Sequence, residues 1–430
     1  MTDAARRLTA LAGVLLGSPL PVRIRAWDGS EAGPPDAPVL VVHHRRALRR
    51  LLWQPGELGL ARAWVAGELE IEGDLYAGLD AIGGVLWERA AAPAAPRPSL
   101  RDREVRRAVR ELLALARPLP APAPPPEEVS RRSGARHSKR RDRQAISHHY
   151  DVGNDFYARV LGPSMVYSCA YWHDGGTLEE AQYDKLDLVC RKLGLREGDR
   201  LLDVGCGWGA MAVHAAREYG ARVTGITLSR EQAVHALKRV AEEGLADRVE
   251  IRVQDYRDVR DGPYDAVSSI GMAEHVGAAR YGEYARTLFG LLRPEGLLLN
   301  HQIARPPEPD EAAYRIDEFI DAYVFPDGEL SPLGSTVGRL EAAGFEVRDV
   351  QSLREHYALT LRAWVRNLEA HWPEAVRLTS PGRARVWRLY MAASALGFEH
   401  GRLGVNQVLA VRPGPRGSAP LPLRPREWTG

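Results

Sequence analysis

The chain contains 430 residues, of which 45% are hydrophobic and 27% are charged, and its formal net charge at pH 7 is +2. This length exceeds one typical domain and supplies ample material for a buried core, so we expect one large domain and a smaller one. The three cysteines, Cys169, Cys190 and Cys206, offer neither a disulfide framework nor metal-ligand spacing. They exclude a disulfide-stapled secreted domain and a cysteine metal centre, and no metal site is expected.

Residues 1–90 alternate short strand-like segments with turns. Strands are expected at 21–27 and 39–44, on either side of a segment rich in glycine and proline. A helix is expected over 45–54, and the stretch 61–75 could close a compact fold. The region is therefore predicted to be a small α+β accessory domain.

Residues 91–147 differ in composition and are interpreted as a linker. A helix is expected over 100–117, and the prolines of 118–126 cannot continue it. Seven basic residues follow between Arg131 and Arg143. The run is typical either of a solvated linker or of a contact with anionic lipid headgroups, with nucleic acid as the weaker alternative. It contains no aromatic residue for base stacking, so no nucleic-acid partner is expected.

From residue 148 to 411, strand-like segments alternate with helical ones. Strands are expected at 200–207, 221–229, 249–256, 264–272 and 296–304, with helices at 210–220 and 230–245. Strands separated by helices of this length form βαβ units, whose parallel sheet is covered on both faces. We therefore predict a Rossmann-like α/β domain with a mainly parallel sheet, followed by a disordered tail at 412–430.

Three glycines spaced two residues apart, Gly205, Gly207 and Gly209, directly follow the apolar run 201–204. In an open α/β sheet, ligands bind beyond the carboxyl ends of the strands, where glycine lets the backbone approach them. The spacing differs from the dinucleotide fingerprint, and a tight structural turn is the alternative interpretation. Asp203 at the strand end would meet a polar or cationic ligand, which favours a binding loop.

Six segments of the second region form an ordered set of motifs. They are HHYDVGNDFYARVLGPSMVYSCAYW (148–172), LLDVGCGWG (201–209), VTGITLSREQ (223–232), IGMAEHVG (270–277), NHQIA (300–304) and HYALTLRAWVRNLEAHWPE (356–374). In order and spacing they resemble the cyclopropane fatty acid synthase family of class I S-adenosylmethionine (SAM) methyltransferases. The resemblance implies a seven-stranded, mainly parallel sheet with SAM as cofactor. It assigns SAM binding to Tyr150, Ser168, Asp203, Gly205, Gly207, Gly209, Thr227, Leu228, Gln232, Gln254 and Asp255.

The resemblance implies an enzyme that alkylates the cis double bond of unsaturated, oleoyl-type phospholipid acyl chains through a carbocation. The accessory domain, and Ala273 where many synthases have Phe, favour the actinobacterial branch that makes 10-methylene chains on the route to tuberculostearic acid. The alternative within the family is a cyclopropane-fatty-acyl-phospholipid synthase. Further alternatives are methylation of a small molecule or RNA on the same fold, and a non-catalytic SAM- and lipid-binding subunit.

Such a reaction needs a base inside a dry lipid tunnel, because water would quench the cation. In this family a bound bicarbonate is thought to serve, and the resemblance assigns its site to Cys169, Glu274, His301, Ile303 and Tyr357, with His275 adjacent. Glu274 would share a proton with the anion, which calls for a raised pKa. Without the resemblance, Glu274 with His275 is typical of a polar loop, His301 of a core hydrogen bond, and Cys169 of a small buried apolar residue.

The expected partners follow from substrate and product. The substrate lies in the membrane, so we expect a cytoplasmic protein peripherally associated with the inner face of the cell membrane. The apolar run within residues 1–20 is too short to span that membrane. A methylene product implies a reductase partner that depends on FAD and NADPH. The N-terminal domain could dock that partner, promote a homo-oligomer or contact the bilayer.

Overall fold

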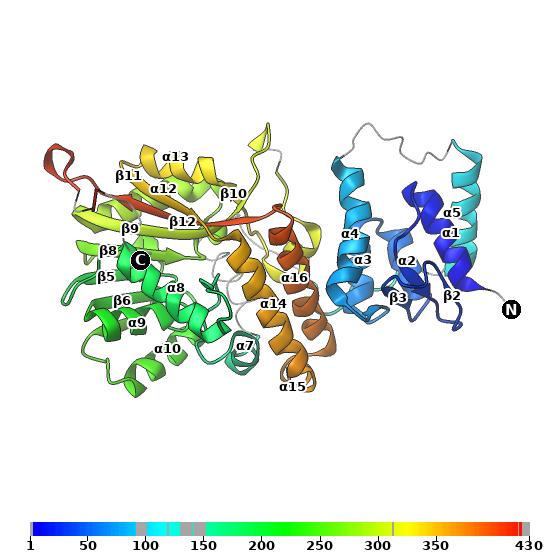
Figure 1. Ribbon diagram of the computed structural model, residues 1–430, viewed down its shortest axis with the longest axis horizontal. Coiled ribbons are helices and arrows are strands. Elements are labelled where there is room, and N and C mark those ends of the chain that lie inside the picture. The colour runs from blue at the N-terminus through cyan, green and yellow to red at the C-terminus, as the bar shows by residue number, and fades with distance from the viewer. Residues whose placement is uncertain are drawn as a thin grey trace. The chain divides into compact units, whose positions relative to one another are not determined.

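The computed structural model describes residues 3–91, 101–117, 120–129, 141, 152–311, 314–419 and 421–423. The chain divides into two compact units (Figure 1). The first consists of Met1–Val129, Glu318–Val324 and Ser380–Leu396, and the second of Ser130–Asp317, Phe325–Thr379 and Gly397–Gly430. Each unit therefore draws on segments that are far apart in the sequence.

The first unit is a small α+β fold. Its elements are α1 (Ala4–Leu16), β1 (Arg23–Arg25), β2 (Glu31–Ala32), β3 (Val39–Val42), α2 (Arg46–Trp53), α3 (Glu57–Val65), β4 (Leu69–Glu72), α4 (Leu75–Ala91) and α5 (Arg103–Ala116). The strands form one sheet in the order β2-β1-β3-β4, with β1 and β3 parallel and the other pairs antiparallel. The α+β architecture predicted for the N-terminal region is confirmed.

Two helices outside residues 1–90 complete this unit. Helix α5, which falls in the predicted linker, packs Leu115 into the same apolar cluster as Leu8 of α1. Helix α16 (Pro381–Glu399) joins through Glu70, whose carboxylate pairs with Arg385 at 2.6 Å and with Arg388 at 2.8 Å. The unit thus differs from the predicted linear boundaries, because apolar faces and ion pairs decide which core a helix joins.

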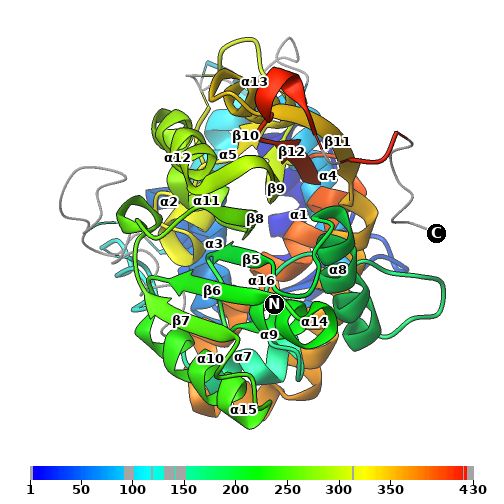
Figure 2. The ribbon, with the colours of Figure 1, turned by 90° about the vertical axis from the view of Figure 1, so that its left-hand side faces the viewer.

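The second unit is built on one large sheet (Figure 2). Its elements are α7 (Asn154–Leu161), α8 (Leu178–Lys192), β5 (Arg200–Val204), α9 (Ala210–Tyr219), β6 (Arg222–Thr227), α10 (Arg230–Glu242), β7 (Val249–Val253), β8 (Tyr264–Ile270), α11 (Ala273–Val276), α12 (Ala278–Leu291), β9 (Leu292–Arg305), β10 (Ser331–Pro332), α13 (Leu333–Ala342), β11 (Glu346–Ser352), α14 (Arg354–Ala370), α15 (Trp372–Leu378) and β12 (Gly404–Val411). Short helical turns lie at Tyr256–Asp258 and Pro415–Gly417, and a π-helical turn of the first unit lies at Ile320–Val324.

The strand order is β11-β12-β9-β8-β5-β6-β7, with the two-residue β10 beside β9. The pairs from β9 through β8, β5 and β6 to β7 are parallel, whereas β12 runs antiparallel to both of its neighbours. The predicted seven-stranded, mainly parallel class I methyltransferase sheet is confirmed along this path, and β10 is an addition. Parallel strands place their carboxyl ends at one edge, where a binding site can form.

Helices cover both faces of this sheet. Leu201 packs with α8, α9 and α10 in one apolar cluster, and the adjacent Leu202 packs with α12 and α13 in another. Successive side chains of a strand point to opposite faces, so an uninterrupted apolar run is buried on both sides. The sheet edge beside the glycine turn is thereby held between two packed layers.

The segment 412–419, assigned by its composition to a disordered tail, continues along β9. The amide of Arg412 donates to the carbonyl of Gly296 at 2.9 Å. Its guanidinium donates to the carbonyl of Leu292 at 2.6 Å. These contacts with main-chain carbonyls hold Arg412 against β9, and composition carries no signal for them. Residue 420 and residues 424–430 of the predicted tail lie outside the described residues.

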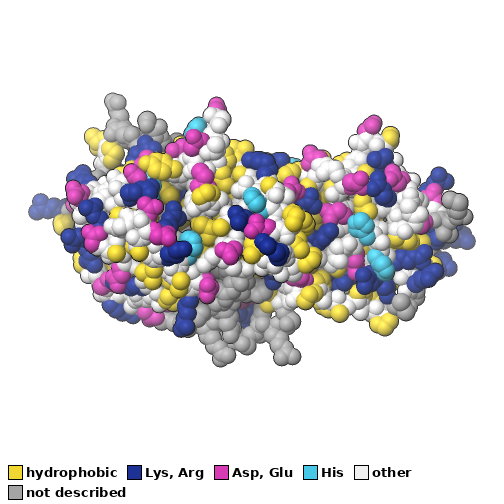
Figure 3. Space-filling model, turned by 90° about the horizontal axis from the view of Figure 1, so that it is seen from below, with side chains coloured by type: hydrophobic (Ala, Val, Ile, Leu, Met, Phe, Trp, Pro, Cys, Tyr) yellow, Lys and Arg dark blue, Asp and Glu magenta, His cyan; other side chains and the backbone are white. Residues whose placement is uncertain are grey.

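Side chains of both signs are interspersed on the face drawn in Figure 3. Ion pairs are frequent among the described residues; for example, Arg217 lies 2.8 Å from Glu218 and 3.3 Å from Glu243. Among the helices of the described residues, none combines the length and hydropathy required to cross a bilayer.

Candidate active site

Glycine shapes the turn after β5. The backbone φ angles of Gly205, Gly207 and Gly209 are +81°, +54° and +83°, values that residues with a side chain rarely adopt. The amide of Gly205 donates to the carbonyl of Ile226 at 2.9 Å and fixes the turn against β6. A Cβ at Gly209 would lie 3.0 Å from the Cβ of Ala236 in α10, whereas one at Gly207 would meet nothing within 4 Å. Helix packing therefore requires Gly209, and Gly207 leaves open space beside the backbone.

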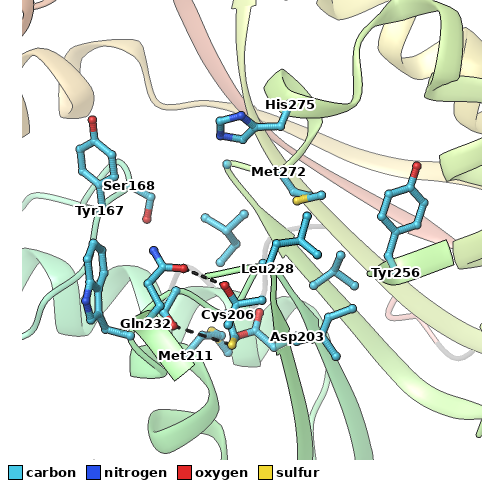
Figure 4. Close-up of a pocket in the computed structure, with 18 of the residues that line it drawn as sticks. Tyr167, Ser168, Asp203, Cys206, Met211, Leu228, Gln232, Tyr256, Met272 and His275 are labelled. Atoms are coloured by element: carbon cyan, nitrogen blue, oxygen red, sulfur yellow. Dashed lines mark hydrogen bonds between the residues drawn. The ribbon is translucent and has the colours of Figure 1, made fainter. Parts of the chain in front are cut away.

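A cavity lies over this turn (Figure 4). Nine of the predicted cofactor-binding residues line it, namely Ser168, Asp203, Gly205, Gly207, Thr227, Leu228, Gln232, Gln254 and Asp255. Gly209 instead precedes α9 as its N-cap, and Tyr150 lies outside the described residues. In Figure 4, Ser168, Asp203 and His275 approach the cavity from three sides.

Asp203 is a buried carboxylate at the end of β5. Its Oδ1 accepts a hydrogen bond from Ser268 Oγ at 2.7 Å, and no described residue bonds to its Oδ2. Burial raises the pKa of Asp203 to about 6, against the opposing effects of the Ser268 hydrogen bond and the charge of Lys185. A mostly ionised carboxylate with one open oxygen suits a ligand group that is cationic or donates hydrogen bonds.

The end of β6 supplies a second polar wall. Thr227 Oγ1 donates to Gln232 Oε1 at 2.8 Å, and the amide of Ser229 donates to Thr227 Oγ1 at 3.2 Å. Ser229 also caps α10 by accepting from the Gln232 amide at 3.2 Å. The amide of Gln254 donates to the Thr227 carbonyl at 3.0 Å. This local network turns Thr227, Gln232 and Gln254 toward one cavity.

Asp255 has a partner that the sequence analysis missed. The guanidinium of Arg257 binds both oxygens of the Asp255 carboxylate, with Nε to Oδ1 at 2.8 Å and Nη2 to Oδ2 at 2.6 Å. Both residues line the cavity. The sequence did hold a signal for this ion pair: Asp255 and Arg257 are two residues apart directly after a strand, and a turn brings such neighbours together.

Glu274 lies in α11, directly after β8. Its Oε1 accepts a hydrogen bond from the amide of Ile303 at 2.7 Å, and its Oε2 has no hydrogen-bond partner among the described residues. Burial raises the pKa of Glu274 to about 7, while the hydrogen bond from the Ile303 amide opposes this rise. Near neutral pH this carboxyl can therefore hold or release a proton.

His301 and Ile303 share one face of β9, two residues apart. The Nδ1 of His301 lies 3.4 Å from Nε2 of Gln407, which is opposite it on β12. Within the described chain, His301 Nε2 has no hydrogen-bond partner. Burial, with the charges of Lys185 and Lys192, lowers the pKa of His301 to about 3. The imidazole is therefore neutral at physiological pH.

Cys169 and Tyr357 meet at the carbonyl of Leu353. The Tyr357 amide donates to it at 3.1 Å, and Cys169 Sγ lies 3.6 Å away. The amide of Leu353 donates in turn to Val405, which pairs with Ile303 across the β12–β9 ladder. Burial raises the pKa of the Cys169 thiol well above its usual value, so the sulfur is no thiolate nucleophile.

Four of the predicted catalytic residues thus form two pairs, each held together by hydrogen bonds. Glu274 bonds directly to Ile303, and Cys169 joins Tyr357 through Leu353. His275 follows Glu274 in α11 but lines the cofactor cavity, with its ring 5.6 Å from that of Phe325. Glu274 is therefore adjacent in sequence to a residue that lines the cavity.

Lys185 of α8 is a further cavity residue that the sequence analysis missed. Its Nζ donates to Ser168 Oγ at 3.1 Å, and its side chain is buried. The contact joins residues 17 positions apart, and no sequence motif marked this lysine.

Comparison with known proteins gives consistent matches. Residues 137–408 match the family described as mycolic acid cyclopropane synthetase. The chain is 46% identical over 416 residues to a probable fatty acid methyltransferase, Rv3720, of Mycobacterium tuberculosis, covering 94% of each. It is 33% identical over 408 residues to the tuberculostearic acid methyltransferase UfaA1 of the same organism, covering 92% of this chain and 89% of that protein. The cyclopropane-fatty-acyl-phospholipid synthase of Escherichia coli is 38% identical over 290 residues, which cover 66% of this chain and 73% of the synthase.

The chain also resembles solved structures. Mycolic acid cyclopropane synthase CmaA1, complexed with SAH and CTAB, superimposes with a TM-score of 0.59 and 35% identity, covering 63% of this chain and 98% of CmaA1. That neighbour holds S-adenosylhomocysteine (SAH), the product form of SAM, on the same class I fold.

Proposed function

Because this chain belongs to the mycolic acid cyclopropane synthetase family, we propose that it transfers a methyl group to the cis double bond of an unsaturated phospholipid acyl chain. Family membership makes it an SAM-dependent enzyme of lipid methylation or cyclopropanation. The finer proposal names the acyl double bond as the acceptor and the 10-methylene chain as the product.

One observation carries the proposal. Met272 and His275 line the cofactor cavity, and Glu274 between them turns its carboxylate to the Ile303 amide on β9. A group that can hold a proton near neutral pH therefore lies beside the cavity in which the methyl donor would bind. Cation chemistry on an acyl chain needs this combination, because a base must act where water is excluded.

The cavity residues fit SAM. The open Asp203 Oδ2 suits the cofactor's ammonium group, and the glycine turn lets the backbone approach the ligand. Thr227, Gln232 and Asp255 present polar side chains at the ends of β6 and β7 for the ribose and adenine. When bound, the cofactor supplies an activated methyl group to the acyl double bond.

We further propose that bicarbonate binds beside Glu274 as the general base. Glu274 Oε2 and His301 Nε2 are buried and, among the described residues, lack hydrogen-bond partners, so an anion could engage both. The Ile303 amide already donates to Glu274 Oε1, and an anion would have to share that donor. Glu274 would offer its proton to the anion, and neutral His301 would donate from Nε2.

The product depends on when the proton is removed. Its loss from the new methyl group closes a cyclopropane ring, whereas a hydride shift followed by proton loss gives an exomethylene group. We favour the 10-methylene product, on the route to tuberculostearic acid, because the match to the tuberculostearic acid methyltransferase extends over both units. A cyclopropane product is the second candidate, favoured by the match to the Escherichia coli synthase.

The proposed substrate and product define the proposed partners. An acyl chain in a bilayer requires peripheral association with the membrane surface. A methylene group requires a separate reductase, dependent on FAD and NADPH, before the chain is saturated. The first unit could dock that reductase or support a homo-oligomer, because it is a compact unit with its own four-stranded sheet.

The proposal is tested in a host that supplies oleoyl phospholipids and expresses this chain alone. Fatty acid methyl esters are separated by chromatography and analysed by mass spectrometry after derivatisation of double bonds, with Glu274→Gln as the control. We expect oleoyl chains to gain one CH2 unit and to remain derivatisable as alkenes. The same gain without an alkene would establish the cyclopropane product, and no gain despite bound SAH would contradict the proposal.

A further inference from the structure

Two of the chain's rare lysines lie buried on one helix. Lys185 and Lys192 of α8 are each 1% exposed and are seven residues apart, so they share a helical face. Lys192 donates to Gln351 at 2.6 Å and lies 3.6 Å from Asp349, away from the cavity. Lys185 lines the cavity. A buried ammonium is costly and needs compensating partners.

The partners of Lys185 belong to the cofactor site. Its Nζ donates to Ser168 Oγ at 3.1 Å, and Gln182, one turn earlier in α8, donates to the Ser168 carbonyl at 3.0 Å. Helix α8 therefore holds both the main chain and the side chain of Ser168. Burial lowers the pKa of Lys185 to about 8, so it remains mostly an ammonium at neutral pH.

The contact with Lys185 determines how the Ser168 hydroxyl can form hydrogen bonds. An ammonium has three donors and no acceptor, so Ser168 Oγ must accept from Lys185. The hydroxyl retains one proton to donate, and within the described chain no residue receives it. Because Ser168 lines the cavity, that proton can serve an acceptor on a bound ligand.

The charges of the cavity fit the two ends of an amino acid. Asp203 presents an open, mostly ionised oxygen, while Lys185 and Ser168 present positive charge and a donor on another part of the wall. The methionine moiety of SAM carries an ammonium and a carboxylate. Opposite charges inside a dry site attract far more strongly than in water.

We propose that Lys185 is a positioning residue for the cofactor: it holds Ser168 Oγ as an acceptor, so that the Ser168 hydroxyl donates to the carboxylate of the methionine moiety. The lysine charge stabilises the same carboxylate without touching it. The inference rests on the proposed SAM site and not on the acyl substrate, so ligand binding alone can test it.

The experiment measures binding of SAH and of 5′-methylthioadenosine, which lacks the amino acid end, to the purified full chain by calorimetry. In Lys185→Met we expect SAH to bind about tenfold or more weakly, because Ser168 Oγ loses the donor that orients it and the ligand carboxylate loses a nearby positive charge, while methylthioadenosine binds within about twofold of its original affinity. Lys192→Met is the matched control, buried on the same helix, and should leave both affinities unchanged. Thermal unfolding checks that each variant is folded.

Ser168→Ala makes a smaller change and keeps the test decisive should Lys185→Met fail to fold. It should show the same selective loss for SAH, and the double variant should lose little more than the larger single loss. An unchanged SAH affinity in both single variants, or equal losses for the two ligands, would overturn the inference. If the unmodified chain bound no SAH, the proposed function itself would fail.

Discussion

Asp203 and Glu274 are two buried carboxylates at the same edge of one sheet, and they differ in what surrounds them. Each has one oxygen held by a single donor, Ser268 Oγ for Asp203 and the Ile303 amide for Glu274. Among the described residues, the second oxygen of each has no hydrogen-bond partner. Burial raises the pKa of Asp203 to about 6 and that of Glu274 to about 7.

The two carboxyl groups also differ in their neighbouring charge. Lys185 favours the ionised form of Asp203, whereas the hydrogen bonds that oppose the rise at Glu274 come from backbone amides. Near pH 7, Asp203 is therefore mostly ionised and suited to binding a cation, while Glu274 is close to its own pKa and suited to sharing a proton. In the proposed reaction, two identical functional groups would thus take a binding role and a catalytic role from their surroundings.

The strongest test of this division is Glu274→Gln. Gln keeps an acceptor for the Ile303 amide but cannot exchange a proton, so methyl transfer to lipid should fall by about 10²- to 10⁴-fold. The affinity for SAH should remain unchanged in calorimetry. Glu179→Gln is the control, because Glu179 also has a raised pKa but bonds to Ser164. If SAH binding were lost as well, Glu274 would be a cofactor-binding residue like Asp203, and the proposed difference between the two carboxylates would be wrong.

A second test uses stability against pH. The pKa of Glu274 rises from 4.5 to about 7 on folding, so between these values the folded protein binds more protons than the unfolded chain. The free energy of unfolding should therefore decrease as pH rises through this window, by roughly 3 kcal/mol from this group. Urea unfolding at several pH values should show a flatter dependence in Glu274→Gln. Superimposable curves for the two proteins would contradict the raised pKa.

Asp203→Asn tests the other carboxylate. Loss of the ionised acceptor should weaken SAH binding by about tenfold, since a buried charge contact is removed. The rate of methyl transfer at saturating SAM should change far less than in Glu274→Gln. Titration calorimetry and initial rates measure the two quantities separately. A variant that binds SAH normally but transfers no methyl group would reverse the proposed roles.

The smallest expected effect comes from Ser268→Ala. Removing the hydroxyl that donates to Asp203 Oδ1 should raise the Asp203 pKa further and weaken SAH binding about threefold, most visibly near pH 6. Ser269→Ala is the adjacent control, because Ser269 bonds instead to Tyr284. Equal effects of the two substitutions would argue against a specific role for the Asp203 hydrogen bond.

The sequence predicts best where the site is local. The strand, the glycine turn and Thr227 with Gln232 lie within segments whose periodicity and turn chemistry are readable, and the structure brings them to one cavity. The hydrogen bond from Ile303 to Glu274 joins residues 29 positions apart. Its existence depends on the register between β8 and β9, which no single-sequence pattern fixes.

Two features were not predicted because both depend on contacts between residues that belong to different elements. Helix α16 joins the first unit through Glu70, more than 300 residues away in the sequence. Lys185 reaches Ser168 from helix α8, for which the sequence analysis predicted no element. Tertiary contacts decide both, and neither is visible in a local sequence pattern.

The most direct test of the central claim follows an isotope-labelled methyl group from SAM into phospholipid vesicles incubated with the purified full chain. Vesicles of cis-unsaturated, trans-unsaturated and saturated acyl chains are compared, and the label is located by mass spectrometry of the released fatty acids. The account predicts label in the cis-unsaturated chains at the former double bond and none in the saturated chains. Label that appears equally in saturated chains, or in the headgroup, would contradict it.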